Sequence, residues 1–192
     1  RIDEHIARLV LTAQRETERG LQAQIAFERQ VEISAAQNLD ARRVIRQVCD
    51  QNKSKLISIF DETQWIIKII SKDNSDLDIF TRSNKYYNIR LSLPGRHQLE
   101  NAICALIGVE LFEQQTGMKS SSAAVASGFR NVRWDGRLQR VSQSPEIILD
   151  VAHNPAALTR IREYFKEFYP DTKVIAVFGI LSDKDCHKML KE

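Results

Sequence analysis

The order of apolar and polar residues along the chain predicts a helical start, a β-rich middle and an alternating α/β end. Apolar residues recur at helical spacing over residues 2–28, and this predicts a first helix. A short extended segment is expected at residues 31–35. A second helix is expected over residues 39–49, and Asn38 can cap its start.

Strand-forming residues dominate the next forty positions. Four short strands separated by polar turns are expected at residues 55–60, 64–71, 77–82 and 86–93. Apolar side chains fill most positions from Trp65 to Ile70, so we expect that strand to be buried on much of both faces. Short neighbouring strands of this kind favour an antiparallel ribbon or the edge of a sheet.

Two helices are expected after this β-rich region. Pro94-Gly95 ends the last strand, and apolar residues at helical spacing predict a long helix over residues 97–115. Residues 120–122 begin a further helix. We expect it to end near Gly128, because glycine favours the carboxyl ends of helices.

The last part of the chain alternates between strand and helix. Residues 147–149 predict a continuous apolar strand, and residues 155–169 predict a helix that begins with proline and is capped by Asn154. A second apolar strand is expected at residues 173–178, before a last helix that Asp183 can cap. This order is typical of a parallel βαβ unit.

Composition and charge exclude several classes of protein. The chain has 192 residues, 43% of them apolar, and a formal net charge of +3 with both signs mixed along the sequence. There is thus no electrostatic case for binding nucleic acid or a membrane surface. No apolar run approaches the length that crosses a bilayer, and we expect no signal peptide. The three cysteines lie far apart, which argues against a disulfide framework or a zinc site and favours a reducing cytoplasm.

Two polar residues follow the predicted strand at residues 147–149. Asp150 and His153 lie at its carboxyl end, beside the amino terminus of the next helix. Ligands collect at such places in α/β sheets, and free N–H groups there suit a phosphate or a carboxylate. The alternative is that both side chains only brace the turn. The local pattern favours neither interpretation over the other.

Four sequence runs together resemble one enzyme family. They are PGRHQLENA at Pro94–Ala102, WDGRLQ at Trp134–Gln139, LDVAHNP at Leu149–Pro155 and FGILSDKD at Phe178–Asp185. In order and spacing they are similar to signatures of the folylpolyglutamate and dihydrofolate synthases, which are members of the Mur ligase superfamily. Asp135 stands where that family usually has proline.

The resemblance implies roles for four residues. Asn101 is expected to bind adenine, because an amide both donates and accepts hydrogen bonds, and Arg137 is expected to contact the phosphates of ATP. Asp150 is expected to contact the ribose, and His153 is the candidate catalytic residue, near the phosphates or the incoming glutamate. The alternatives are a buried amide bond for Asn101 and an ordinary surface role for Arg137. His97 and Gln98 can serve to position the helix that carries Asn101.

Parts of the family pattern are missing from this sequence. There is no G-x-x-G-K-[ST] phosphate loop, so the β- and γ-phosphates have no cradle in this chain. Residues 1–37 match poorly, and Arg29 stands where the family's carbamoylated lysine helps to hold a metal. We expect the ligands of Mg²⁺ to lie outside this chain and the isolated chain to be inactive.

The fold and function implied by the resemblance follow from these pieces. The expected fold is α/β: a partial Mur ligase central domain over residues 1–133, and a truncated Rossmann-like domain with a parallel sheet over residues 134–192. The expected enzyme is a cytoplasmic monomer. It uses ATP and Mg²⁺ to phosphorylate the carboxylate of dihydropteroate or folate, and the amine of L-glutamate then attacks the acyl phosphate. Two alternatives remain: a cell-wall muramyl-peptide ligase of the same superfamily, and a non-catalytic nucleotide-binding module.

Overall fold

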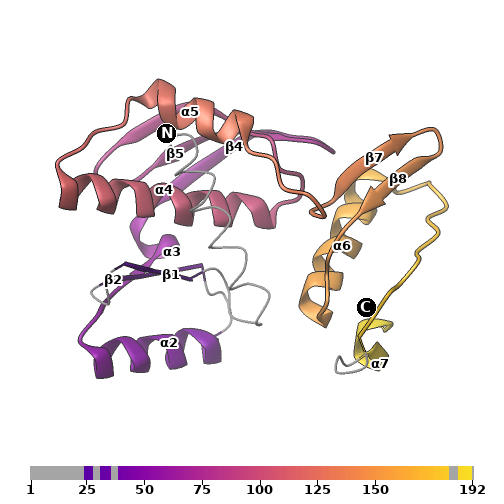
Figure 1. The fold of residues 1–192 in the computed structure, drawn as a ribbon, viewed down its shortest axis with the longest axis horizontal. Coiled ribbons are helices and arrows are strands. Elements are labelled where there is room, and N and C mark those ends of the chain that lie inside the picture. Colours follow the sequence, from indigo (N-terminus) through magenta and orange to yellow (C-terminus); the bar gives the residue numbers. More distant parts are fainter. Residues whose placement is uncertain (1–23, 28–30, 36–38, 182–185, 192) are drawn as a thin grey trace.

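The computed structural model describes residues 24–27, 31–35, 39–181 and 186–191, and they form a larger and a smaller part (Figure 1). The larger part holds two sheets with helices between and around them, and the smaller part holds a hairpin and one long helix. Most of the predicted helix over residues 2–28 lies outside the described residues. Its last part was predicted wrongly, because Gln24–Phe27 is a strand.

The first sheet contains the parallel pairing of this fold. Its elements are β1 (Gln24–Phe27), β2 (Val31–Ser34), β3 (Lys55–Ser58) and the connecting helix α2 (Leu39–Asn52). β1 runs antiparallel to β2, whereas β2 and β3 are parallel, with Ile33 opposite Ile57. Ile45 and Cys49 form the buried face of α2. The predicted strand and helix around residues 31–49 are confirmed.

The second sheet is an antiparallel meander. Its strands are β4 (Gln64–Ile70), β5 (Ser75–Phe80) and β6 (Lys85–Leu91), and the single turn α3 (Ile59–Glu62) precedes them. The predicted antiparallel arrangement is therefore confirmed for these three strands. It is wrong for the strand expected at residues 55–60, because β3 pairs parallel with β2 in the first sheet and residues 59–62 are helical. The predicted burial of β4 is wrong, since Ile66 is 57% exposed and Ile69 is 55% exposed. β4 pairs with β5 along one side and is an edge strand of this sheet, so its apolar composition does not lead to burial.

Helix α4 (His97–Thr116) is the centre of the larger part. It lies between the two sheets, and one hydrophobic core joins residues of both sheets to it. Every residue from Asn101 to Glu110 is buried, so this helix is apolar around almost its whole circumference rather than amphipathic. Helix α5 (Ser122–Asn131) packs against β6 and places Phe129 in the same core. It runs three residues past the end predicted at Gly128.

The smaller part combines a hairpin with a long helix. Its elements are β7 (Gln139–Gln143), β8 (Glu146–Leu149), α6 (Pro155–Phe168) and the short α7 (Cys186–Met189). Asn154 accepts a 2.9 Å hydrogen bond from the backbone N–H of Ala157, so the predicted cap of α6 is confirmed. Leu138, Tyr164 and Tyr169 are the buried members of a separate core here.

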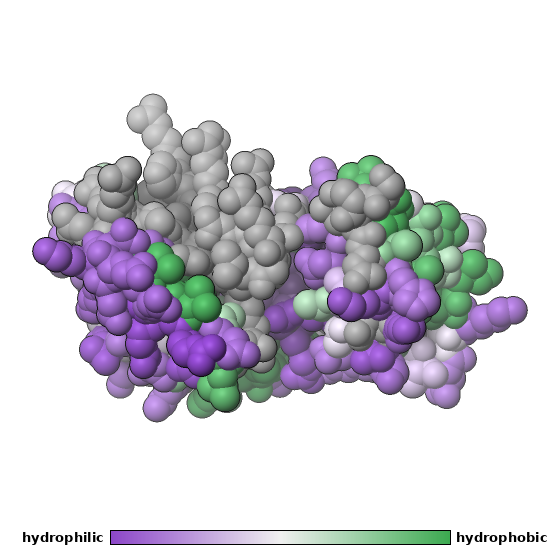
Figure 2. All heavy atoms as spheres, turned by 90° about the horizontal axis from the view of Figure 1, so that it is seen from below, coloured by the Kyte–Doolittle hydropathy of each residue, from purple (hydrophilic) through white to green (hydrophobic). Residues whose placement is uncertain are grey.

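The strand predicted at residues 173–178 is wrong. β8 pairs antiparallel with β7, a strand that the sequence did not predict, and residues 173–178 are irregular. A strand forms only where a neighbour accepts its backbone hydrogen bonds, and this segment pairs with none of the described strands. Its apolar residues are exposed, with Ile175 at 81% and Val177 at 93%. Figure 2 shows hydrophobic surface gathered at the end of the molecule formed by the smaller part.

Two features of organisation follow. The α/β class with a parallel pair of strands is confirmed, and the parallel pair lies between β2 and β3. The two main hydrophobic cores draw on residues 33–132 and 138–169, and the domain boundary between residues 133 and 134 stays a prediction. Within the described ranges, no helix is both long enough and apolar enough to span a membrane.

Candidate functional site: the junction of the two parts

The amino end of α4 carries a chain of three linked side chains. Asn101 Nδ2 donates to Gln98 Oε1 at 3.1 Å, and Gln98 Nε2 lies 3.0 Å from His97 Nε2. Because Gln98 offers an amide N–H at this point, the Nε2 atom of His97 accepts and its Nδ1 carries the proton. Gln98 is only 1% exposed and Asn101 only 5% exposed. The orientation of the Asn101 amide is therefore fixed from within the protein.

His97 also marks where the smaller part meets α4. Burial, together with the charges of the neighbouring Arg160 and Arg137 guanidinium groups, lowers the pKa of His97 to about 3. The ring is therefore neutral near pH 7, which agrees with its role as a hydrogen-bond acceptor. Arg160 comes from α6. Arg137 comes from residues 132–138 between α5 and β7, called the connecting segment below, so three separate elements lie near this ring.

Two glycines allow the backbone to come this close. Gly95 has a φ of +94°, and a Cβ there would lie 2.7 Å from Cε1 of His97 and 3.2 Å from Cδ1 of Leu138. Gly136 has a φ of +71°, and a Cβ there would lie 2.7 Å from Cγ1 of Val151. Both positions combine a left-handed backbone with a crowded neighbour, which glycine alone accepts without strain. Gly95 and Gly136 belong to two of the sequence runs that resemble the folate-ligase family.

Asp150 ties the connecting segment to the end of β8. One carboxylate oxygen accepts from the backbone N–H of Leu138 at 2.9 Å, and the other accepts from Ala152 at 2.8 Å. Burial raises the pKa of Asp150, while these two N–H groups and the charge of Arg137 act in the opposite direction. Asp150 therefore does brace the turn. Each oxygen accepts one of these bonds and keeps a second lone pair for a ligand.

Arg137 is the charged residue that influences both His97 and Asp150. Its charge acts on His97 on one side and on Asp150 on the other. Its guanidinium carbon is 5.8 Å from the centroid of the Trp134 ring. A cavity of about 460 Å³ is lined by Arg137, Trp134 and neighbouring residues of the connecting segment. A second cavity of about 340 Å³ lies between α4 and α6, with His97 and Arg160 on its wall.

Hydrogen bonds link Asn101 through Gln98 to His97, and the charge of Arg137 acts on both His97 and Asp150. That Asn101, Arg137 and Asp150 share one ligand stays a prediction. His153 lies at the start of α6, partly buried, with Nδ1 3.2 Å from the carbonyl oxygen of Val151. Its proposed catalytic role is a prediction that this geometry does not test.

Sequence reasoning missed two members of the junction. Gln98 was expected only to help position the helix, although it carries the link between Asn101 and His97. Arg160 gave no sequence signal, because it lies in no motif and its neighbour Glu100, 3.9 Å away, is sixty residues earlier.

The described residues supply no obvious metal site. Among residues 24–27, 31–35, 39–181 and 186–191, no group of three or more His, Cys, Asp or Glu side chains is arranged to hold a metal ion. The charged groups of the junction are mainly guanidinium groups, which attract phosphate or carboxylate rather than a cation. The chemistry of this junction therefore suits an anionic ligand.

Comparison with known families finds a match for the smaller part. Residues 136–192 match the model of the family described as Mur ligase, glutamate ligase domain. The match begins at Gly136, where the connecting segment enters the smaller part. The smaller part therefore resembles the glutamate ligase domain of Mur ligases.

More particularly, the chain resembles the carboxy-terminal part of dihydrofolate/folylpolyglutamate synthases, as its four sequence runs predicted. It is 27% identical over 159 residues to the dihydrofolate synthase/folylpolyglutamate synthase of Bacillus subtilis, covering 83% of this chain and 37% of that protein. The structure of Mycobacterium tuberculosis folylpolyglutamate synthase complexed with ADP and AMPPCP matches with a TM-score of 0.75 at 27% identity. That match covers 83% of this chain and 36% of the other.

A cell-wall enzyme is also similar. The UDP-N-acetylmuramate–L-alanine ligase of Flavobacterium psychrophilum is 31% identical over 120 residues, covering 62% of this chain and 26% of that protein. The chain therefore spans between about a quarter and little more than a third of the length of these relatives.

Proposed function

We propose that this chain is the carboxy-terminal part of an ATP-dependent amide ligase, and that its share of the active site is the junction around Arg137. One observation carries the proposal: hydrogen bonds link Asn101 through Gln98 to His97, and the charge of Arg137 acts on both His97 and Asp150. The relatives named as synthases and ligases, one of them solved with ADP and AMPPCP, support the choice of nucleotide. We place the domain boundary between residues 133 and 134.

Asn101 is proposed to recognise the adenine base. One of its amide hydrogens is held by Gln98, and the second hydrogen and Oδ1 stay available for a ligand. Such a donor and acceptor side by side match the amino group and a ring nitrogen of adenine. Guanine presents a carbonyl oxygen where adenine has its amino group, so a fixed amide distinguishes the two bases.

Arg137 is proposed to bind the phosphates, and Asp150 the ribose. A guanidinium group offers paired donors that fit phosphate oxygens. The Asp150 carboxylate has lone pairs beyond its two backbone contacts and can accept from a ribose hydroxyl. His153 is proposed to act close to the phosphates or to the amine of the incoming amino acid.

The proposed reaction has two steps. The γ-phosphoryl group of ATP passes to a carboxylate of dihydropteroate or of a folate, giving an acyl phosphate and ADP. The amine of L-glutamate then attacks the acyl carbon, the C–O bond to phosphate breaks, and an amide and inorganic phosphate result. The residues of this chain orient the nucleotide and exclude water from it. No step is assigned to a metal ion, because the described residues offer no set of ligands for one.

Nucleotide binding to the chain tests the proposal directly. We expect isothermal titration to detect ATP binding, with GTP binding at least about tenfold more weakly, since one lost base contact corresponds to about 1.4 kcal/mol. Arg137→Ala is expected to weaken ATP binding and, in the complete enzyme, to reduce turnover more than stability. Equal binding of ATP and GTP would contradict the role of Asn101. An unchanged turnover of Arg137→Ala at saturating ATP would contradict the role of Arg137.

Two other functions remain as alternatives. The similarity to the muramate–alanine ligase favours a cell-wall substrate. Assays of the complete enzyme with glutamate and dihydropteroate, and in parallel with muramyl substrates, separate these two. The missing phosphate-loop sequence favours a non-catalytic nucleotide-binding module. That alternative requires ATP binding without turnover in the complete protein.

A further inference from the structure

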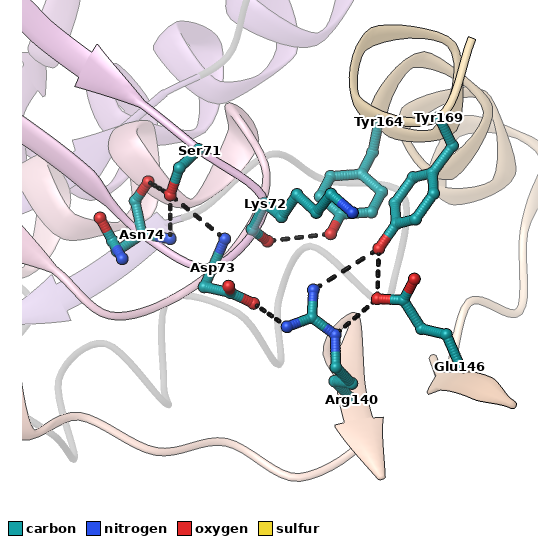
Figure 3. Close-up of polar contacts among 8 residues, drawn as sticks. All are labelled: Ser71, Lys72, Asp73, Asn74, Arg140, Glu146, Tyr164 and Tyr169. Carbon is teal, nitrogen blue, oxygen red and sulfur yellow. Dashed lines mark hydrogen bonds and ion pairs between the residues drawn. The ribbon is translucent and has the colours of Figure 1, made fainter. Parts of the chain in front are cut away.

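The turn between β4 and β5 is a stiff structure that reaches the smaller part. Ser71 N and Ser71 Oγ both donate to the carbonyl oxygen of Asn74 at 2.9 Å, and Ser71 Oγ accepts from the N–H of Asn74 at 3.2 Å (Figure 3). The N–H of Asp73 also points at this hydroxyl, at 3.4 Å. Side-chain bonds of this kind fix the path of a turn. The turn therefore holds Lys72 and Asp73 at its tip in a fixed position.

Three contacts join this tip to the smaller part. Tyr164 of α6 donates its hydroxyl to the carbonyl oxygen of Lys72 at 2.9 Å. The ammonium group of Lys72 lies 4.3 Å from the centroid of the Tyr169 ring. Asp73 Oδ1 lies 2.9 Å from Nη1 of Arg140. Hydrogen bond, cation–π contact and ion pair thus act within one small area, as Figure 3 shows.

On the smaller part, neighbouring side chains fix the position of the Arg140 guanidinium group. Arg140 Nε donates to Glu146 Oε1 at 2.6 Å, and the hydroxyl of Tyr169 donates to the same oxygen at 2.7 Å. Arg140 Nη2 is 3.5 Å from that hydroxyl. Arg140 is on β7, Glu146 is on β8 and Tyr169 follows α6, so the guanidinium group is fixed by three elements. Because it is already ordered, its pairing with Asp73 costs little additional side-chain entropy.

The location of this contact relates it to the candidate site. Asp73, Arg137 and Arg140 line the same cavity of about 460 Å³. Arg137 and Arg140 are only three residues apart, and both lie in or next to the connecting segment. Asn101, in contrast, is part of the larger core through α4. Any rotation of the smaller part about the connecting segment therefore moves Arg137 relative to Asn101, and the turn opposes such a rotation.

We propose that the Ser71–Asn74 turn is a docking element that fixes the orientation of the smaller part, with Asp73, Arg140 and Tyr164 as positioning residues for the site around Arg137. The turn holds the guanidinium group of Arg137 at the position where it shares a ligand with Asn101. That the turn fixes the orientation of the smaller part does not depend on the proposed function. The expected effect of this orientation on the affinity for nucleotide rests on that function.

A distance measurement between the two parts tests the docking role. Spin labels at Gln115→Cys on α4 and Lys166→Cys on α6 occupy exposed helix positions, in a chain with Cys186→Ser. The double variant Asp73→Asn with Tyr164→Phe removes the charge and the hydroxyl at the contact and leaves the rings and backbone in place. We expect one narrow distance distribution in the parent chain and a broad or shifted one in the double variant. An unchanged distribution in the double variant overturns the proposal.

Matched controls separate docking from a general loss of stability. Asp76→Asn breaks a bidentate pair with Arg90 that lies wholly within the antiparallel sheet, and Tyr87→Phe removes an exposed hydroxyl on the same sheet. This control pair should leave the distance distribution unchanged. Asp73→Glu with native Tyr164 should keep the carboxylate and restore the narrow distribution. A broadening by the control pair equal to that of the docking variant also overturns the proposal.

Nucleotide affinity provides the second readout. If the competent orientation falls to between a tenth and a half of the population, the affinity for ATP should fall by about two- to tenfold. The control pair should keep the parent affinity. If the parent chain does not bind ATP, the proposed function is contradicted. If the distance distribution nevertheless changes in the double variant, the docking role is still supported. A changed distribution with unchanged ATP affinity overturns the positioning role.

Discussion

Arg96 and Glu167 form a two-pronged ion pair between the start of α4 and the end of α6. Arg96 Nε donates to one carboxylate oxygen at 2.9 Å, and Arg96 Nη2 donates to the other at 2.5 Å. The pairing holds the arginine charged and raises its pKa. Together with the Ser71–Asn74 turn, the pair attaches the smaller part at a second place.

Removal of this ion pair should have a small and salt-dependent effect. The Arg96 side chain is 58% exposed, so we expect Glu167→Gln to reduce the free energy of unfolding by at most about 1 kcal/mol. Urea titrations at low and at high salt measure this, and the difference should shrink at high salt because counterions screen the pair. Asp40→Asn is the control, since Asp40 pairs with Arg43 on the surface of α2 and should have almost no effect. An effect of Glu167→Gln that is equal at both salt concentrations would contradict an electrostatic contribution.

The low pKa of His97 predicts acid sensitivity. The folded-state pKa of about 3 lies below that of an unfolded histidine, so folding excludes a proton at this ring. The stabilising contribution is complete above about pH 6.5 and is lost as the pH falls towards 3, by up to about 1.4 kcal/mol per pH unit. Denaturant titrations between pH 7 and pH 4.5 should show this slope in the parent chain. They should show a shallower slope in His97→Gln, and parallel slopes would refute the assignment.

Gly95 should tolerate alanine less well than Gly117 does. Both have positive φ, but a Cβ at Gly117 meets nothing within 4 Å, whereas at Gly95 it meets the His97 ring. Gly117→Ala should therefore cost about 1 kcal/mol for the backbone alone. Gly95→Ala should cost about 1–3 kcal/mol more, because the ring and Leu138 must shift. Thermal unfolding of both variants gives the comparison, and equal losses would mean that the crowding around Gly95 is relieved without cost.

The Gln98 link should matter for both stability and binding. Gln98→Leu keeps the size of this buried side chain but leaves Asn101 Nδ2 and His97 Nε2 without the partner seen here. We expect a loss of about 1–3 kcal/mol in the free energy of unfolding. ATP should also lose its advantage over GTP, because the Asn101 amide is then free to rotate. Gln115→Leu, an exposed position on the same helix, is the control and should change neither quantity.

Local sequence signals predicted the helix ends and turns well. Asn154 and Pro155 specify the start of α6 through the chemistry of a single turn, and the structure has that cap. The polar run at residues 72–75 predicted a turn between two strands in the same way, and the structure has that turn at residues 71–74. Such features depend on residues next to one another, so they can be recognised without knowledge of the rest of the fold.

Pairing between distant segments could not be predicted in this way. β7 is made of Gln139–Gln143, whose polar composition gives no strand signal, and its place depends on β8 and on the bond from Leu138 to Asp150. Residues 173–178 have the opposite character: an apolar run without a paired strand. Composition describes the preference of a segment, whereas a sheet also requires an available neighbouring edge.

Some residues of the candidate site were predicted from the sequence and others were not. Motif resemblance selected Asn101, Arg137 and Asp150, and their shared role in binding a nucleotide stays a prediction. Gln98 takes part through contacts with His97 and Asn101 within α4 itself. Arg160 takes part through its contact with Glu100, which depends on the packing of α6 beside α4.

The position of α4 has a consequence for how the larger part unfolds. This helix is the common wall of both sheets, so water cannot reach the core of one sheet without exposing the other. The larger part should therefore open as one cooperative unit, and the backbone amides of residues 101–110 should be the last to exchange their hydrogens with solvent.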